Sequence, residues 1–312
     1  MARPIIIDCD PGVDDAIALL LAIANPTELD ILGITTVAGN VPLHFTSQNA
    51  LKICALANAN IPIYAGCPRP ILRPLETAAD VHGATGLQGA ELPKPQQPLM
   101  VQHAVAFLIS TLQQATIPVT LATLGPLTNI AVALIQAPHI AEKIDQIVAM
   151  GGSITHGNMT PSAEFNIYVD PHAAQVVFQS GIPINLITLD TTHQVLTTSD
   201  HLTAFRQLNT LVSNAAADLL THYGTPDIKR YGMPGAPLHD PCVIAYLLRP
   251  ELFTFRPSYT AIDTTSPDNL GRTVIDWWGR TGQPANTHVA ESVDSKGIYT
   301  LLIEAFANYP NP

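Results

Sequence analysis

Residues 4–15 read PIIIDCDPGVDD, an apolar run followed by four acidic residues within eight positions. The apolar residues Ile5 to Ile7 do not alternate with polar ones, which is typical of a strand buried on both faces. The next apolar segment, Val13 to Ala24, has the length of a helix. A buried strand followed closely by a helix predicts the first βα unit of a parallel sheet.

Segments of strand length and of helix length keep alternating along the chain. We expect strands at 31–37, 119–124, 146–150 and 183–189, and helices at 43–58, 127–136, 170–179 and 295–308. Residues 201–248 have a helical pattern, and residues 252–293 have a β-like pattern. Together these patterns predict one α/β domain, residues 1–312, with a mostly parallel central sheet and helices on both faces.

The charge composition limits the class of partner. Only 12% of the 312 residues are charged, the formal net charge is −11, and the Lys and Arg residues form no cluster. Nucleic-acid binding needs such a cluster, so we expect an uncharged small molecule as the substrate. Low charge with 47% apolar residues also suggests extensive buried surface, and we expect a homo-oligomer, either a dimer or a tetramer.

Cysteine usage and hydropathy indicate the compartment. The four cysteines, Cys9, Cys54, Cys67 and Cys242, are dispersed and show no zinc-binding spacing. A chain of this length with its own core needs no disulfide framework, so a reducing cytoplasmic setting is expected. No signal peptide or membrane span is expected, because the longest apolar run, residues 16–24, is shorter than the roughly 20 residues that cross a bilayer.

The acidic cluster lies where the first strand ends, the place at which open α/β sheets bind ligands. A pair of like charges about 4 Å apart costs about 4 kcal/mol at an effective dielectric near 20, so buried carboxylates need a cation or a proton between them. An acidic helix N-terminus would explain Asp14 and Asp15 but not Asp8 and Asp10, which precede the helix. Because the donors are all oxygens, Ca²⁺ or Mg²⁺ is favoured over zinc.

Residues 8–15, DCDPGVDD, resemble the N-terminal signature of the nucleoside hydrolases. Further segments match that family in order: residues 36–40, 124–129, 150–152, 163–171 and 238–241. The resemblance covers essentially the whole chain. It implies a single nucleoside hydrolase-like α/β domain that uses Ca²⁺ to hydrolyse the N-glycosidic bond of ribonucleosides, giving ribose and free base.

The resemblance also implies the metal ligands and the base that activates water. Asp10, Asp15 and Asp240 would bind the ion with the backbone carbonyl of Leu124, while Asp8 would be structural. Asp10 would accept the proton of the attacking water. We expect an oxocarbenium-like transition state and inversion at the anomeric carbon, because no second carboxylate can be assigned as a nucleophile.

His239 lies in Leu238-His239-Asp240-Pro241, directly before an expected metal ligand. A lone histidine before an aspartate is more often structural. In this family context it becomes the expected proton donor to the departing base, work that an unperturbed pKa near 6.5 would suit.

Five side chains resemble the residues that hold the sugar in this family: Asp14, Asn40, Met150, Glu164 and Asn166. Taken alone, Asn40 reads as a turn residue and Met150 as core packing. Glu164 and Asn166 are two positions apart, and we expect them to point to the same side of an extended segment.

We expect the base to be recognised by two parts of the chain, the loop at residues 66–98 and the helical region at residues 201–248. His82, in this long loop rich in Pro and Gly, and Tyr231 resemble base-contacting residues of pyrimidine-preferring members, which predicts uridine and cytidine as substrates. Tyr223 and Arg230 could also approach the base. Long loops without regular structure are usually functional.

Two other functions remain open from the sequence. A non-catalytic, metal-stabilised nucleoside or ribose binding protein could share this fold, although Asp10 and His239 are both present. A phosphatase with an aspartyl nucleophile also begins with two aspartates after a strand. There a Gly-Thr pair usually follows, whereas Pro11-Gly12-Val13 follows here.

Overall fold

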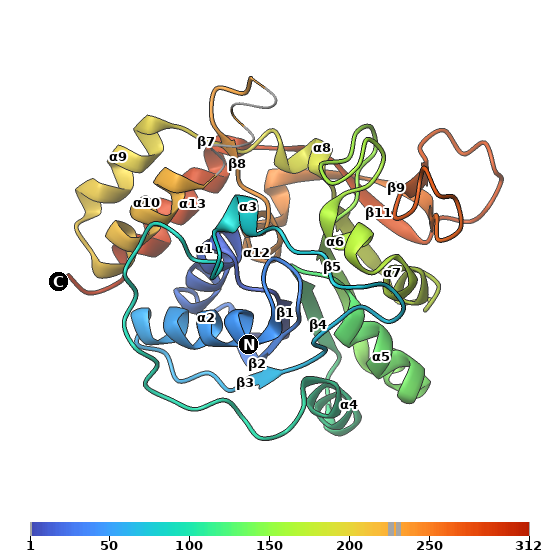
Figure 1. Cartoon of the computed structure of the whole chain (residues 1–312), viewed down its shortest axis with the longest axis horizontal. Coiled ribbons are helices and arrows are strands. Elements are labelled where there is room, and N and C mark those ends of the chain that lie inside the picture. Colours follow the sequence, from blue (N-terminus) through green and yellow to red (C-terminus); the bar gives the residue numbers. More distant parts are fainter. Residues whose placement is uncertain (1, 224–227, 229–231, 312) are drawn as a thin grey trace.

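The computed structural model describes residues 2–223, 228 and 232–311. Strand β1 (Arg3–Cys9) lies inside a nine-stranded sheet of order β10-β9-β11-β6-β5-β4-β1-β2-β3 (Figure 1). It pairs in parallel with β2 (Leu29–Thr36) on one side and with β4 (Val119–Thr123) on the other. Its side chains alternate between the two faces of the sheet, so that Ile5 and Ile7 join one apolar core and Ile6 joins the other.

Most of the remaining strands extend the parallel sheet towards its two edges. They are β3 (Ile63–Ala65), β5 (Ile144–Met150), β6 (Ile184–Ile187) and β11 (Thr287–Val293). Strand β9 (Phe253–Ile262) is antiparallel to β11, and β10 (Thr273–Asp276) is antiparallel to β9. A separate two-stranded ribbon joins β7 (Leu196–Thr197) to β8 (Ala236–Pro237).

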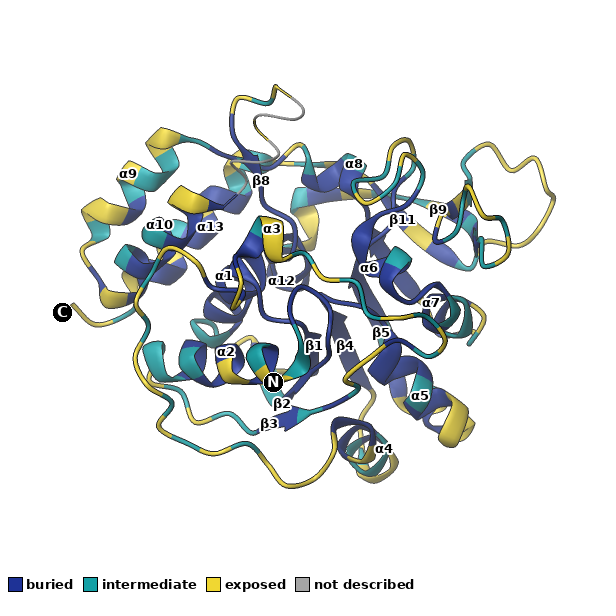
Figure 2. Ribbon diagram, in the orientation of Figure 1, coloured by how far each residue is buried: buried dark blue, intermediate teal, exposed yellow. Residues whose placement is uncertain are grey.

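Helices cover both faces, as predicted. One core contains residues of α1 (Val13–Ile23), α2 (Leu43–Leu56), α9 (Ser199–Leu208), α10 (Leu211–His222), α12 (Pro241–Leu248) and α13 (Ser295–Ala307). The other contains residues of α4 (Ala104–Gln114), α5 (Thr128–Gln136), η1 (Pro138–Lys143) and α7 (Pro171–Phe178). Figure 2 shows α1 and the central strands buried, whereas α9 exposes its outer face.

The order of the strands creates a crevice beside β1. From β1 the chain moves through β2 and β3 towards one edge, and from β4 it moves through β5 and β6 towards the other. Neighbouring strands whose connections leave in opposite directions form a switch point, and ligands bind at the carboxyl ends of the strands there. The acidic residues that follow β1 therefore lie at the expected ligand site.

The predicted strands and helices are present, and the structure contains further elements that the sequence patterns did not indicate. Strand β3 and helix α4 were not predicted, and the 66–98 loop contains one short helix, α3 (Ala79–His82). The extended segment expected around Glu164 and Asn166 is wrong, because α6 (Phe165–Val169) begins directly after Glu164. The Glu164 side chain accepts the backbone N–H groups of Asn166 and Ile167, and such capping favours a helix start over an extended chain.

Two short elements complete the described chain, α8 (Leu189–Thr192) and η2 (Pro250–Leu252). Among the described residues, no helix combines the length and the apolar character that crossing a bilayer would require.

Candidate active site

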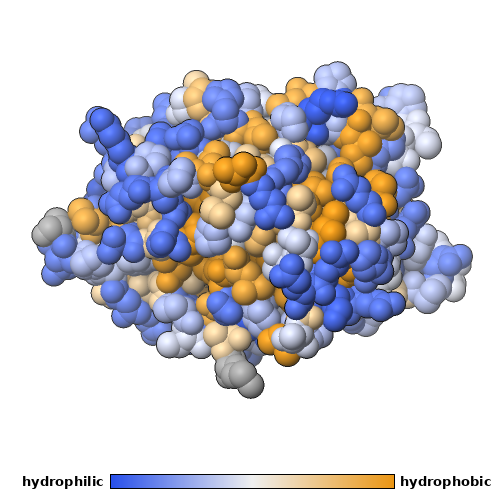
Figure 3. All heavy atoms as spheres, turned by 90° about the horizontal axis from the view of Figure 1, so that it is seen from below, coloured by the Kyte–Doolittle hydropathy of each residue, from blue (hydrophilic) through white to orange (hydrophobic). Residues whose placement is uncertain are grey.

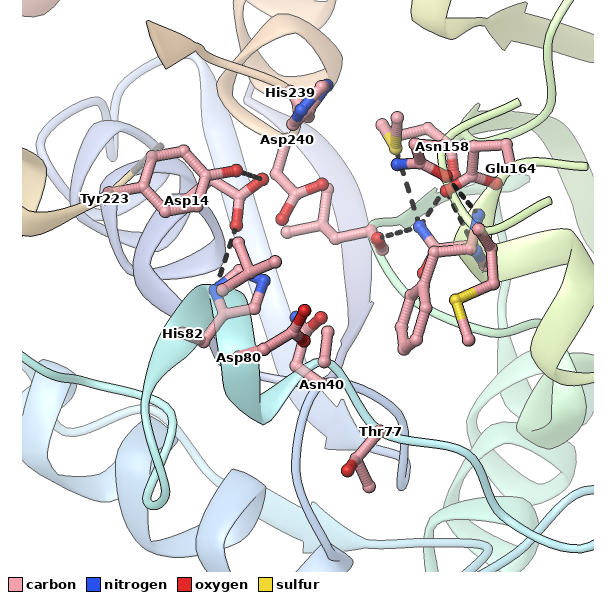
Figure 4. Close-up of a pocket in the computed structure, with 17 residues that line it drawn as sticks. Asp14, Asn40, Thr77, Asp80, His82, Asn158, Glu164, Tyr223, His239 and Asp240 are labelled. Carbon is pink, nitrogen blue, oxygen red and sulfur yellow. Dashed lines mark hydrogen bonds and ion pairs between the residues drawn. The ribbon is translucent and has the colours of Figure 1, made fainter. Parts of the chain in front are cut away.

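Four buried aspartates gather at the switch point. Asp10 directly follows β1, Asp14 and Asp15 lie in the first turn of α1, and Asp240 directly precedes α12. Carboxylate oxygens of Asp14, Asp15 and Asp240 all lie within 4.8 Å of one another. Figure 4 shows Asp14 and Asp240 side by side among the residues that line the pocket. The fold thus brings together side chains from opposite ends of the chain.

Burial and mutual repulsion disfavour the ionised forms of these carboxyls. Burial, followed by the charge of Asp14, raises the pKa of Asp15 to about 7. Burial also raises the pKa of Asp10, with the charge of Asp15 adding to the effect, and that of Asp240, with the charge of Asp14 adding. Buried carboxyls this close together are stabilised by a proton or by a cation between them.

The donor set fits a hard divalent cation. Two buried oxygens, Oδ1 of Asp10 and Oδ1 of Asp14, have no hydrogen-bond partner, and a cation would satisfy such atoms. Leu124 lines the same pocket. Its carbonyl oxygen accepts a hydrogen bond from Nδ2 of Asn166 at 2.7 Å and keeps a second lone pair for a metal. All the donors are oxygens, which Ca²⁺ prefers.

Asp10 lies beside this group of oxygens and not within it. Its Oδ2 accepts the backbone N–H of Asn40 at 2.7 Å. A Cβ atom added at Gly39 or Gly125 would fall 2.1 Å or 2.2 Å from an Asp10 carboxylate oxygen, so both glycines leave room for this side chain. The structure therefore brings Asp15 and Asp240 together with Asp14, while Asp10 as a metal ligand stays a prediction.

Asn40 is held against the carboxylates by its own side chain. Its Nδ2 donates to the carbonyl oxygen of Asp10 at 3.2 Å and to Oδ2 of Asp15 at 3.1 Å. Asp15 also accepts the backbone N–H of Gly12 at 2.9 Å. These bonds fix Asn40 and Asp15 in one orientation beside the pocket.

Glu164 and Asn166 lie in the opposite wall. The Glu164 carboxylate accepts the backbone N–H groups of Gly152 and Asn166, each at 2.8 Å. Gly152 has a φ of +71°, a conformation that permits the tight turn after β5. Burial raises the pKa of Glu164 to about 7 despite these bonds. Asn166 also donates to the carbonyl oxygen of Met150 at 3.3 Å, and Met150 lines the pocket.

His82 and Tyr223 approach Asp14 from a third side. The Tyr223 hydroxyl donates to Oδ2 of Asp14 at 3.0 Å. Nδ1 of His82 accepts the backbone N–H of Val13 at 3.1 Å. Because a backbone N–H can only donate, Nδ1 carries no hydrogen and the neutral ring has its hydrogen on Nε2. The 3.9 Å approach of Nδ1 to Asp14 is therefore not an ion pair, and burial lowers the pKa of His82 accordingly.

His239 lines the pocket with its ring almost fully buried. Its Nδ1 lies 2.7 Å from the hydroxyl of Thr192. Burial lowers the pKa of His239 to about 4, so the ring is neutral near pH 7. The ordinary pKa expected from the sequence is wrong for this reason. A neutral imidazole can still donate a hydrogen bond.

Most of the predicted residues surround one pocket of about 230 Å³ (Figure 4). They are Asp14, Asn40, His82, Leu124, Met150, Glu164, Asn166, His239 and Asp240, together with Tyr223. Tyr231 and Arg230 lie outside the described residues.

Four polar or aromatic lining residues were not predicted: Thr77, Asp80, Asn158 and Phe165. Thr77 and Asp80 belong to the 66–98 loop, which the sequence already marked as functional, and Phe165 lies between two predicted residues. Asn158 carries no comparable signal in the sequence.

Comparison with known proteins agrees with this geometry. The family profile of the inosine-uridine preferring nucleoside hydrolases matches residues 5–300. The chain belongs to this family. This nucleoside hydrolase is therefore an enzyme that acts on N-ribosyl bonds, and the phosphatase and the non-catalytic binding protein are set aside.

Individual relatives cover the hydrolase almost completely. A pyrimidine-specific ribonucleoside hydrolase RihA from Photobacterium profundum is 48% identical over 99% of this chain and 100% of its own length. RihA from Shewanella sp. (strain ANA-3) is 45% identical over 99% and 98%. A solved purine-preferring ribonucleoside hydrolase from Gardnerella vaginalis has a TM-score of 0.91 and 32% identity over 98% of both chains. The names of these relatives differ in the preferred base.

Proposed function

We propose that this nucleoside hydrolase cleaves the N-glycosidic bond of pyrimidine ribonucleosides, uridine and cytidine, in a Ca²⁺-dependent reaction. The observation that carries the proposal is the buried aspartate group with two unpartnered oxygens, in a pocket that also contains His82 and His239. Sugar-binding and base-binding groups then lie on either side of the bond to be broken.

Asp10, Asp15, Asp240 and the carbonyl of Leu124 would hold the cation. When bound, Ca²⁺ would hold ribose hydroxyls and the attacking water in place and make that water more acidic. Asp10 accepts the proton of the water as the water attacks C1′, because its Oδ1 accepts no hydrogen bond from the protein.

The sugar is bound by Asp14, Asn40, Glu164 and Asn166, with Met150 against its apolar side. Their side chains carry the acceptors and donors that ribose hydroxyls need, and several are already fixed by hydrogen bonds. Positive charge develops on the sugar ring as the bond breaks, and the buried carboxylates stabilise it.

The base is bound by hydrogen-bond donors. His82 offers its Nε2–H, and His239 offers the ring edge that Thr192 does not occupy. Uracil and cytosine carry a carbonyl oxygen on the carbon next to the glycosidic nitrogen, an acceptor that the purines lack at that position. Donation to this oxygen stabilises the negative charge of the departing base. Tyr231 stays a predicted base contact, and Arg230 a candidate.

Release of free base from uridine, cytidine, inosine and adenosine tests the proposal. We expect kcat/KM for the two pyrimidine nucleosides to exceed that for the purine nucleosides by at least about tenfold, the equivalent of about 1.4 kcal/mol of transition-state binding. A purine preference, or binding of nucleosides without hydrolysis, would contradict it.

We also propose that the hydrolase acts as a cytoplasmic homo-oligomer, a dimer or tetramer, in nucleoside salvage. Its four cysteines are free, which suits a reducing compartment. Large apolar side chains, among them Val101, Ile117 and Ile135, are exposed, and Figure 3 shows apolar groups on the face seen from below. Light scattering tests the assembly, and a clean monomer at micromolar concentration would exclude it.

A further inference from the structure

The His239 ring has a partner outside the pocket. The hydroxyl of Thr192 lies 2.7 Å from its Nδ1, and Thr192 is fully buried. Thr192 is the last residue of α8 and does not line the pocket. Thr192 therefore contacts the Nδ1 edge of the ring from outside the pocket lining.

The backbone holds these two residues in register. The segment after α8 runs into β7, which pairs with β8, and β8 ends two residues before His239. The carbonyl oxygen of Val195 accepts the backbone N–H of Leu238 at 2.8 Å. The end of α8 and the chain around His239 thus form one hydrogen-bonded unit, and the approach of Thr192 to the ring follows from the fold.

The direction of the hydrogen bond determines which ring nitrogen carries the hydrogen. The Thr192 hydroxyl has two candidate acceptors, Nδ1 of His239 at 2.7 Å and the carbonyl oxygen of Leu189 at 3.4 Å. The 2.7 Å contact accommodates donation in either direction, because the hydroxyl can donate to Nδ1 or accept from it. We take the arrangement in which the hydroxyl donates to Nδ1, since the alternative leaves it only the marginal 3.4 Å contact with Leu189. The ring hydrogen then lies on Nε2.

The same arrangement holds if the ring gains a proton. Nδ1–H then donates to the Thr192 oxygen, and the hydroxyl turns to the carbonyl of Leu189. In both cases Nε2 keeps its hydrogen, and Nε2 is the ring nitrogen that Thr192 does not contact.

We propose that Thr192 is a positioning residue that keeps the Nε2–H of His239 directed at the departing base. This rests on the proposed function. In that reaction the C1′–N bond breaks and its electron pair goes to the base, while the water oxygen bonds to C1′ and the water proton goes to Asp10. The base anion takes up a proton from solvent on release, and Asp10 returns its proton to solvent. The Nε2–H hydrogen bond stabilises the charge on the base, and Thr192 itself touches no reacting atom.

Thr192→Val removes the hydroxyl and keeps the shape of the side chain. We expect kcat for uridine to fall about tenfold, the lower end of the range for losing a residue that orients an active-site group. The rate with p-nitrophenyl riboside should change less than about twofold, because that leaving group needs no hydrogen bond. Thr192→Ser, which restores a hydroxyl, should recover most of the uridine rate.

Thr191→Val is the matched control. Thr191 is equally buried, but its hydroxyl donates to the carbonyl oxygen of Ala290 at 2.8 Å and not to a ring. This variant loses a buried hydrogen bond of the same kind, so its Tm should fall while the ratio of uridine to p-nitrophenyl riboside rates stays that of the wild type.

Nitrogen NMR of ¹⁵N-histidine-labelled protein reads the tautomer directly, with the His239 signals identified by their absence in His239→Gln. In the wild type we expect one His239 tautomer, with the hydrogen on Nε2. In Thr192→Val we expect a mixture of the Nε2–H and Nδ1–H tautomers. Hydrogen on Nδ1 in the wild type, or equal losses on both substrates in Thr192→Val, would overturn the role of Thr192. Failure of the wild type to hydrolyse uridine would instead overturn the proposed function.

Discussion

Asp8 and Asp10 are two positions apart in the same acidic run, yet their surroundings differ. The Asp8 carboxylate accepts hydrogen bonds from the Thr35 hydroxyl at 2.5 Å and from Nδ2 of Asn129 at 2.8 Å. Asp10 keeps one buried oxygen without a partner. Oδ2 of Asp8 also lacks a partner, so the two carboxyls differ in their neighbours and not in the number of satisfied oxygens. Two side chains, Thr35 and Asn129, hold Asp8, which supports a structural role, whereas Asp10 is held by the backbone of Asn40, a residue of the pocket.

Gly12 tests the packing around His82. A Cβ atom at this position would lie 2.4 Å from Nδ1 of His82 and 2.9 Å from Nδ2 of Asn40. Gly12→Ala should therefore displace both side chains and lower kcat/KM for uridine by about tenfold or more, because a misplacement near 1 Å can cost about a hundredfold. Steady-state kinetics with uridine measure the effect.

Gly181→Ala is the control for Gly12→Ala. Gly181 has a φ of +78° and no atom within 4 Å of an added Cβ, so this substitution strains the backbone without touching the pocket. Its Tm should fall and its kcat/KM should stay unchanged. If Gly12→Ala keeps the wild-type kcat/KM for uridine, the close approach of Gly12 to His82 is not needed for activity.

At the level of elements, the sequence predicted those with long apolar runs and clear boundaries. Helix α4 was missed because its N-cap is His103, which is not among the usual capping residues. Strand β3 has only three residues, too few for a periodic pattern. Helix α6 was missed because the Glu164 carboxylate caps it, an arrangement that spacing alone cannot distinguish from an extended segment.

The 66–98 loop is tied to α6 by one side chain. The guanidinium of Arg73 donates to the carbonyl oxygen of Tyr168 and stacks 4.0 Å from the centroid of its ring. The loop supplies His82 and α6 supplies Asn166, so Arg73 connects two walls of the pocket. Arg73→Ala should raise KM for uridine about three- to tenfold, with a smaller change in kcat, because a loosened loop costs about 1 kcal/mol to order.

Arg69→Ala provides the comparison for Arg73→Ala. Arg69 lies in the same loop, but its side chain bonds only to the carbonyls of Pro70 and Ile71 among the hydrogen bonds of the described residues. KM should therefore stay that of the wild type. An unchanged KM in Arg73→Ala would show that this connection does not shape the pocket.

At the scale of the whole molecule, the site depends on contacts that no local pattern contains. Asp15 and Asp240 meet only because α1 and α12 both start at the same edge of the sheet. The family resemblance predicted both as ligands, but the sequence could not show that Asp14 joins them. The low pKa of His239 likewise results from burial by the complete fold.

The same burial predicts how the stability of the metal-free hydrolase varies with pH. The pKa values of Asp8, Asp15 and Glu164 rise to about 7 by burial, so the folded state binds more protons than the unfolded state between about pH 4 and 7. Their contribution to stability is present at low pH and is lost as the pH rises through 7. The pKa of His239, lowered to about 4, acts in the opposite direction over the same range.

Burial also raises the pKa values of Asp10 and Asp240. The combined effect of the five carboxyls on stability should therefore outweigh the opposite effect of His239. We expect the Tm of chelator-treated protein to fall by at least about 4 °C between pH 5 and 7.5, the equivalent of about 2 kcal/mol for a chain of this size. Added Ca²⁺ should reduce or reverse the fall, since it favours the ionised carboxylates. A Tm that rises with pH in the metal-free protein would contradict this balance.

Uridine hydrolysis during a Ca²⁺ titration measures whether the buried aspartates act through a metal. The purified hydrolase is first stripped of divalent ions with a chelator, and Ca²⁺ is then returned stepwise while release of uracil is followed. We predict no activity at the start and saturable recovery at one ion per chain, as expected for one aspartate site. Full activity in the presence of excess chelator would contradict a metal role for Asp10, Asp15 and Asp240.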